Sequence, residues 1–222
     1  MAAGGEEPTA GVVRLPPGRH GLSRDAVSES QRQRLLNGVV DAVVEHGYNA
    51  TTIAQLIEAA AVSRRTFYEH FADKEECFLA AYEMVVAHVR DSLREAGDLP
   101  AWPDRVRAEL ATLLRIFAAD PTIARFLLLE SLAAGGEVAA RHRASLRCIA
   151  ELLRPAPPGT ADELAEAREQ ALVGGVSTLI VRRLKAGEAS SLEDLLPDLH
   201  ELVLTSYLGR REAQRLARAS AA

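Results

Sequence analysis

The sequence predicts an all-α protein, and two observations carry this prediction. Apolar residues recur at intervals of three or four along most of the 222-residue chain, and no segment shows the alternation typical of a strand. Polar and glycine signals that begin and end helices separate these segments. With 48% hydrophobic residues, the chain is long enough to bury a core without disulfides or metals.

The first helix is predicted to begin near Ser28. Residues 1–27 contain several prolines and glycines and no apolar period, so they are predicted to form a flexible N-terminal arm. Ser28 and Gln31 form a possible capping box, and Leu36 belongs to an apolar stripe that follows. Gly47 supplies the C-terminal stop.

Two short helices and a long one come next. Thr52, with Gln55, has the pattern of a capping box, and Ser63 is a good N-cap for a further short helix. Phe67 and Phe71 lie four residues apart and are predicted to point inward together. Asp73 is the predicted cap of the long helix. Short capped helices separated by a tight turn are typical of a DNA-binding helix-turn-helix, which predicts such a domain over residues 28–74.

Residues 75–222 are predicted to form a C-terminal helical domain for effector binding and dimerisation. Breaks are expected at Asp120-Pro121, Gly135-Gly136, 155–159 and Gly187, and Thr160 with Glu163 is a further capping pattern. The stretch from Ala171 to Val181 is apolar on nearly every side and contains Gly174 and Gly175. Such a helix needs cover all round, which predicts a second copy of the chain as its partner.

The residue types on the third helix suit the reading of a DNA groove. With the phenylalanines held inward, the free side is predicted to offer Arg64, Arg65, Thr66 and Tyr68. Arginine can pair with the guanine edge, and threonine and tyrosine can bond to bases or the backbone. Thr52 and Lys74 stand at the openings of two other helices, where a phosphate is favoured.

The overall charge argues in the opposite direction. The net charge is −5, and residues 1–74 carry eight Lys/Arg against nine Asp/Glu. Any basic surface must therefore be small, which suits a short helix docked in one groove better than a protein that wraps nucleic acid. The prediction of a DNA partner depends on the pattern of residues and not on charge.

The segment TTIAQLIEAAAVSRRTFYEHFADKEECF (51–78) closely resembles the N-terminal domain of the tetracycline-repressor (TetR) family. The resemblance runs from about Gln31 to Ala87 and rests on Thr52, Val62, Ser63, Thr66, Phe67, Tyr68, His70, Phe71 and Lys74. It implies a homodimeric repressor, with an effector pocket in the C-terminal domain and dimerisation through the last two helices. The operator would be a pseudo-palindrome in double-stranded DNA. The predicted DNA-binding residues are Thr52, Ser63, Arg64, Arg65, Thr66, Tyr68, His70 and Lys74.

Two positions depart from the family pattern. Ala61 stands in the turn where the family often has glycine, and a left-handed alanine would cost on the order of 1 kcal/mol. Many members have a small residue at the position of Arg65, which makes Arg65 the leading candidate for this protein's own sequence preference.

Simpler roles remain open for several of these residues. Arg64 and Arg65 could be solvated helix residues, Tyr68 could belong to the core, and His70 could be a cap or a filler. The arginines of the arm, at positions 14, 19 and 24, could lie in a minor groove or in a solvated tail.

The effector is expected to be a small apolar or amphipathic molecule. The candidate effector-binding residues lie on or beside apolar stripes of the second half, and each could instead be ordinary core or solvated edge. They are Trp102, Phe117, Phe126, Glu130, His142 and Arg147.

Other classes of function find less support in the sequence. Neither a nucleophile elbow, nor a phosphate-binding loop, nor a zinc-binding helix appears, so no enzyme activity, cofactor or metal is predicted. The two cysteines, Cys77 and Cys148, stand apart, and no run is apolar enough for a membrane span, which predicts a cytoplasmic protein. A helical protein-interaction module without sequence-specific DNA binding is the alternative, and it leaves the polar set on the third helix unexplained.

Overall fold

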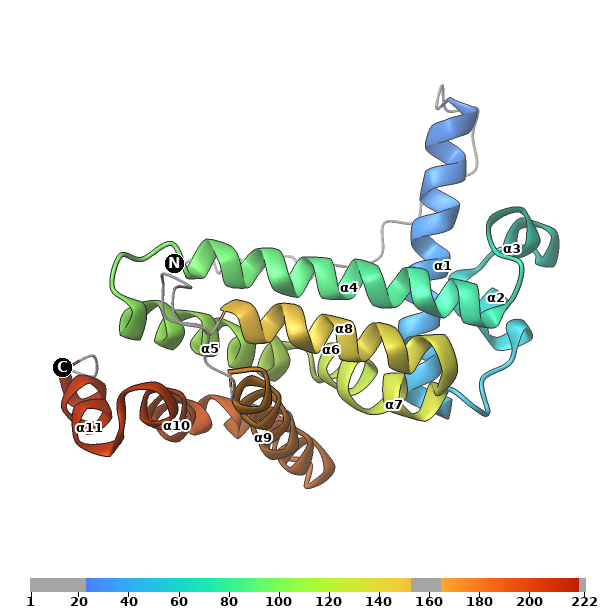
Figure 1. Ribbon diagram of the computed structural model, residues 1–222. Helices are drawn as coiled ribbons and strands as arrows, with labels where there is room; N and C mark the ends of the chain where they lie inside the picture. The colour runs from blue at the N-terminus through green and yellow to red at the C-terminus, as the bar shows by residue number, and fades with distance from the viewer. Residues whose placement is uncertain (1–22, 153–164, 220–222) are drawn as a thin grey trace, which may run out of the picture.

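The computed structural model describes residues 23–152 and 165–219, and these residues are helical with no strand among them, as predicted (Figure 1). None of the described helices is long and apolar enough to cross a membrane. The α-helices are α1 Arg24–His46, α2 Ile53–Ala60, α3 Arg64–His70, α4 Lys74–Ala96, α5 Trp102–Ala119, α6 Pro121–Arg125, α7 Ser131–Ala134, α8 Gly136–Leu152, α9 Ala165–Lys185, α10 Leu196–Leu208 and α11 Arg210–Ala219. A π-helical turn covers Phe126–Glu130, and a 3₁₀ helix covers Ala189–Leu195.

The first helix begins earlier than the sequence pattern predicts. Ser23 is the N-cap of α1, and its side chain accepts a hydrogen bond from the Ala26 amide. The predicted start at Ser28 is therefore wrong, because Ser23 offers an equally good cap one turn earlier and the residues between the two serines lie exposed on the helix. Of the predicted arm, 1–27, residues 1–22 lie outside the described residues, and residues 23–27 form the N-cap and first turn of α1.

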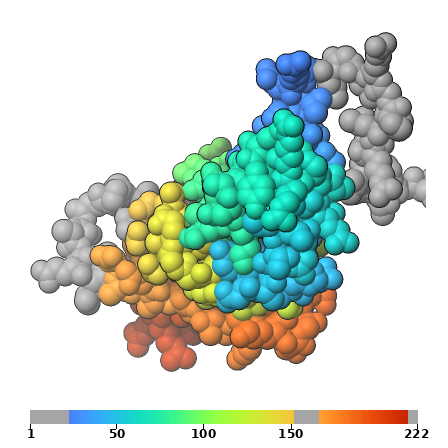
Figure 2. Space-filling view, turned by 90° about the vertical axis from the view of Figure 1, so that its right-hand side faces the viewer, coloured from blue at the N-terminus to red at the C-terminus, as the bar shows by residue number. Residues whose placement is uncertain are grey.

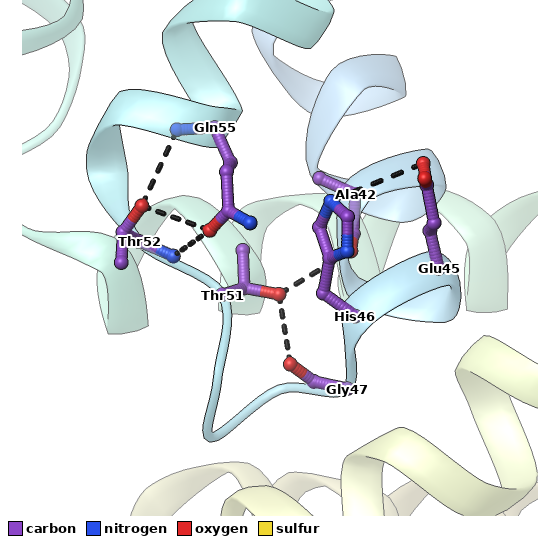
Figure 3. A network of polar contacts seen from close by, with 7 residues as sticks. All are labelled: Ala42, Glu45, His46, Gly47, Thr51, Thr52 and Gln55. Carbon is purple, nitrogen blue, oxygen red and sulfur yellow. Dashed lines mark hydrogen bonds and ion pairs between the residues drawn. The ribbon is translucent and has the colours of Figure 1, made fainter.

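The predicted caps of the next helices are confirmed. The Thr52 hydroxyl accepts from the Gln55 amide, and the Gln55 side chain accepts from the Thr52 amide at 2.8 Å, which completes the capping box drawn in Figure 3. Ser63 and Asp73 cap α3 and α4. The buried Thr51 hydroxyl, also in Figure 3, donates to carbonyls of α1 and of Gly47 and so ties the loop before α2 to the end of α1.

The first two helices approach each other at a glycine. A Cβ added to Gly38 would stand 2.8 Å from the backbone nitrogen of Ala60, a distance that real side chains do not reach. Leu35, Leu56 and Phe67 fill the space between α1, α2 and α3 and are fully buried. This close packing holds α3 on the other two helices and leaves its outer side exposed.

Ala61, in the turn after α2, adopts the left-handed conformation despite its cost, with φ 50° and ψ 49°. Its amide bonds to carbonyls of the last turn of α2, and its carbonyl accepts from Arg34 at 3.1 Å. The turn therefore keeps its usual geometry despite the side chain.

We expect Ala61→Gly to raise the free energy of unfolding by about 1 kcal/mol, because glycine adopts this conformation without steric cost. Denaturant unfolding of the two proteins measures the difference. Ala59→Gly is the matched control, since residue 59 is exposed and inside α2, where glycine should destabilise by about 1 kcal/mol. Equal effects at both positions would contradict the strain at Ala61.

The long helix α4 joins the two halves of the chain. It packs on α1 at one end, and its remaining length lies beside α5 and α8 (Figure 1). α9, α10 and α11 follow on the side of α5 and α8 that faces away from α4. The predicted breaks at Asp120-Pro121, Gly135-Gly136 and Gly187 are present, whereas the loop at 155–159 and the Thr160–Glu163 cap lie outside the described residues.

Candidate nucleic-acid interface and effector cavity

The short helix α3 has one buried side and one exposed side. Phe67 is fully buried, and Phe71 beyond the helix end is nearly so. Arg64, Arg65 and Tyr68 are exposed, Tyr68 to 48%. Figure 2 views the molecule from the end where α2 and α3 lie, and their cyan surface stands at the front beside α1. The exposed side therefore offers two cations and a phenol to a partner.

Weak contacts hold these exposed side chains. Arg65 Nε lies 2.9 Å from a carboxylate oxygen of Glu69 in an exposed ion pair. The Arg64 guanidinium lies 5.7 Å from the centre of the Tyr68 ring, which itself packs edge-on against Phe67. Exposed contacts of this kind contribute about 0–1 kcal/mol, so a nucleic acid can replace them at little cost.

Thr66 differs from its neighbours on α3. The prediction that it lies on the exposed side is wrong, because only 9% of the residue is accessible. Its hydroxyl lies 2.8 Å from the Ser63 hydroxyl, and its amide donates to the same serine oxygen. Thr66 and Ser63 together complete the N-terminus of α3.

Lys74 is half-buried at the start of α4 and binds the loop before α2. Its ammonium donates to the carbonyls of Tyr48 and Thr51, at 2.8 and 3.0 Å, and lies 4.4 Å from the centre of the Tyr48 ring. Two of its three donors are therefore used within the protein, and one remains for a phosphate. No local pattern predicts these contacts, because they join residues more than twenty positions apart.

The other predicted contacts stand at the edges of this surface. Thr52 is exposed at the capped start of α2, and Ser63 is exposed at the start of α3. His70 is half-buried at the end of α3, with its ring 6.3 Å from that of Phe71. Five of the predicted contacts are therefore exposed, namely Thr52, Ser63, Arg64, Arg65 and Tyr68.

A cavity of about 60 Å³ lies inside the C-terminal half. Residues of α4, α5, α8, α9 and the π-helical turn line it, and most of them are leucine, valine, isoleucine or phenylalanine. Of the six predicted effector residues, Phe117 and His142 line this cavity. Its polar lining also includes Tyr82, Ser145 and Ser177.

The remaining four predicted effector residues lie elsewhere. Trp102 packs edge-on against Tyr207, and Phe126 is fully buried against Phe78. Arg147 is exposed in a separate groove between α8 and α9. Glu130 faces the N-terminal helices. Position on an apolar stripe did not distinguish the lining of a cavity from close-packed core.

The polar groups near His142 bond to one another. Its Nδ1 lies 3.0 Å from the Tyr82 hydroxyl and 3.2 Å from the Ser131 hydroxyl, and Ser131 donates to the Leu127 carbonyl. Burial lowers the pKa of His142, and the nearby Arg143 lowers it further. Burial raises the pKa of Tyr82 to about 12. The pair is therefore a neutral one at neutral pH.

Glu109 is a cavity residue that the sequence analysis missed. It lies on α5 in the stripe of Val106, Leu110 and Leu113, and only 4% of it is accessible. Burial raises its pKa to about 7, against the opposing effect of Arg105. A lone carboxylate within an apolar stripe is the signal that could have identified it.

Glu130 connects the π-helical turn to the N-terminal helices. Its Oε2 accepts from the Tyr48 amide at 2.8 Å, in the loop that Lys74 also binds. Asn49 of the same loop donates to the Ala133 carbonyl. Leu127 and Leu128 of the turn line the cavity, so one short segment contacts both the cavity and the loop before α2.

Comparison with known proteins identifies the N-terminal helices. Residues 36–81 match the family model described as "Bacterial regulatory proteins, tetR family". The chain is 33% identical over 96 residues to the HTH-type transcriptional repressor AcnR of Corynebacterium diphtheriae, which covers 38% of this chain and 50% of the repressor. The chain thus spans about half the length of this curated relative.

The whole fold resembles solved structures of regulators. The fatty acid degradation regulator FadR from Bacillus halodurans superposes with a TM-score of 0.68 at 17% identity, over 80% of this chain and 96% of that one. FadR from Bacillus subtilis, solved in complex with stearoyl-CoA, gives 0.65 at 14% identity, over 78% of this chain and 98% of that one. Residues 36–81 are therefore similar to the N-terminal domain of the tetR family of bacterial regulatory proteins, and the described chain shares the fold of these solved regulators.

Proposed function

We propose that the protein is a DNA-binding transcriptional regulator, a repressor that a small effector releases from a pseudo-palindromic operator. The observation that carries this proposal is the exposed side of α3, where Arg64, Arg65 and Tyr68 stand together while Phe67 anchors the helix. Base edges in the major groove are read by such residues on a short, rigidly packed helix. The likeness of part of the chain to a transcriptional repressor, and the match of residues 36–81 to the tetR family model, support it.

Phosphate contacts would come from the residues around α3. Thr52 and Ser63 stand at capped helix starts, where backbone amides attract an anion, and Lys74 and His70 would add positive or donor groups. The protein would act in the cytoplasm, where its DNA lies. It needs no enzymatic step.

A second copy of the chain would supply the second half of the operator contact. α9 exposes Gly174 and Thr178, and α10 exposes Leu202 and Leu208. A Cβ at Gly174 or Gly175 would meet nothing within 4 Å, so a partner helix can approach that side of α9 closely. A two-fold dimer places two recognition helices in successive major grooves, roughly 34–36 Å apart.

The cavity is the proposed effector site, and α4 is the helix proposed to transmit effector binding to the N-terminal helices. α4 lines the cavity with Tyr82, Val86, Val89 and Leu93 and carries Lys74 at its other end. A ligand that tilts α4 would move both recognition helices and change their spacing, so that affinity falls without loss of any contact.

We expect Glu130→Ala to loosen the loop before α2, because it removes a hydrogen bond from the Tyr48 amide to a charged acceptor, a bond worth about 1 kcal/mol or more. Hydrogen exchange of the Tyr48 amide should become faster, and operator affinity should fall a few-fold. Glu137→Ala is the control, since that exposed carboxylate pairs only with Arg141 among the contacts of the described residues. Unchanged exchange at Tyr48 would contradict the connection.

Selection of bound duplexes from a random pool tests the proposed function. We expect a recovered pseudo-palindrome, bound by the parent protein and lost as the salt concentration rises. The alternative function, a helical protein-interaction module, predicts no enrichment of any sequence and no retention on duplex DNA at low salt.

A further inference from the structure

One carboxyl oxygen of a residue that lines the cavity has no hydrogen-bond partner among the described residues. Glu109 is 4% accessible, and its Oε2 is buried without a partner among the described residues. A Cβ at Gly97 would collide with the other oxygen, so Oε1 packs directly on that glycine at the end of α4. The carboxyl group is thus fixed on one side and unsatisfied on the other.

Buried polar groups are normally paired, because an unpaired one loses its hydration without compensation. The other polar groups of the cavity already have partners in part. Tyr82 and His142 bond to each other, and Ser145 donates to the Arg141 carbonyl. A buried acceptor that its own protein leaves unpaired, beside a cavity lined mostly by apolar residues, is typical of a group that binds a ligand.

Charge decides which ligand suits this oxygen. The cation that acts on Glu109 is Arg105, one helical turn earlier on α5, and its influence on the pKa of Glu109 does not overcome the effect of burial. An ammonium group would supply both a donor and the compensating charge, and it favours the ionised carboxyl. A ligand carboxylate would bring a second negative charge into the same apolar space, and an alcohol would bring a donor without charge.

We propose that the cavity binds an apolar amine, with the hydrocarbon part among the valines and leucines and the protonated amino group donating to Glu109 Oε2. This inference rests on the proposed function only in taking the cavity as the effector site. The cavity, at about 60 Å³, is small, so a short chain suits it better than a long acyl chain.

A matched series of hexyl compounds tests the proposal. Hexylammonium, 1-hexanol and hexanoate share one tail and differ in the head group. Titration calorimetry at pH 7 with the full chain should give the ammonium a dissociation constant at least about tenfold lower than that of the alcohol, with hexanoate weakest. Glu109→Gln should remove the preference for the ammonium and leave 1-hexanol binding within about threefold.

Glu95→Gln is the control, because it removes the same charge from an exposed position of α4. It should behave as the parent does. The proposal is overturned if hexanoate or 1-hexanol binds the parent as tightly as hexylammonium, if the preference survives in Glu109→Gln, or if none of the three binds. If Glu109→Gln does not fold, the order of the three dissociation constants measured on the parent protein tests the proposal.

Operator binding by the same preparations separates this inference from the proposed function. If the protein binds the operator but shows no preference for the amine, the amine site is contradicted and the proposed regulator function stands. If it prefers the amine but does not bind duplex DNA, the proposed regulator function is contradicted and the amine site stands.

Discussion

Replacing Arg65 by alanine is expected to weaken binding to the selected operator about 10- to 100-fold and to relax the preference for bases at one position of each half-site. A bidentate contact between arginine and a base edge contributes about 1–3 kcal/mol of discrimination. Arg64→Ala should act in the same way at a neighbouring position. Binding assays on the operator and on single-base variants measure both effects.

The ion pair of Arg65 in the free protein does not oppose this role. The Arg65 side chain is 89% exposed and that of Glu69 51%, so the pair contributes at most about 1 kcal/mol. DNA binding would exchange it for a stronger contact. Glu69→Ala is therefore expected to raise operator affinity a few-fold, because it frees Arg65 and removes a negative charge near the phosphates.

Lys74→Ala should produce a different pattern. It removes the proposed phosphate contact and the two bonds to the loop before α2, so it should weaken all duplexes alike and lower the salt dependence by about one unit per half-site. Thermal unfolding reports the loss of the loop contacts separately. Equal loss of base selectivity in Lys74→Ala and Arg65→Ala would contradict the division of roles.

Local features of the sequence predicted the local features of the fold. Thr52, Ser63 and Asp73 cap their helices as expected, because each cap depends on hydrogen bonds within a few residues. The predicted start of the first helix was wrong because local signals did not choose between two serines. Ser23 and Ser28 are both acceptable caps, and nothing local chooses between them.

Features that join distant segments were not predictable in the same way. The contacts of Lys74 with Tyr48 and Thr51, and of Glu130 with Tyr48, depend on how α1, α4 and the π-helical turn pack. The π-helical turn contains a run of four apolar residues, Phe126 to Leu129. This run looks like part of an ordinary helix in the sequence. Pattern identified which residues face inward but not which inward residues meet.

The candidate cavity illustrates this difference. Phe117 and His142 line it, whereas Trp102 and Phe126 lie on equally apolar stripes and pack against other aromatic rings. A cavity is a place where packing is incomplete, and that depends on the shapes of several helices at once. Glu109 was missed as well, although its charge on an apolar stripe is visible in the sequence.

A charge placed on the exposed side of α10 is expected to have the largest effect on operator binding. Val176 and Leu199, apolar residues of the two helices proposed to pair, are buried within one protomer, so charging either would unfold the chain rather than divide a dimer. Leu202 is 41% exposed and lies on the same helix as Leu199. Leu202→Glu should therefore leave the protomer folded and make it monomeric.

The monomer should bind the full operator at least about 100-fold more weakly than the parent, because each copy then contacts its half-site without the partner held at the matching distance. Leu132→Glu is the matched control, since Leu132 is 59% exposed on α7, away from α9 and α10. It should keep both the mass and the affinity of the parent. Sedimentation, circular dichroism and operator binding give the three readouts. A folded, monomeric Leu202→Glu that binds the full operator as tightly as the parent would show that neither the paired helices nor the spacing of two recognition helices sets the affinity.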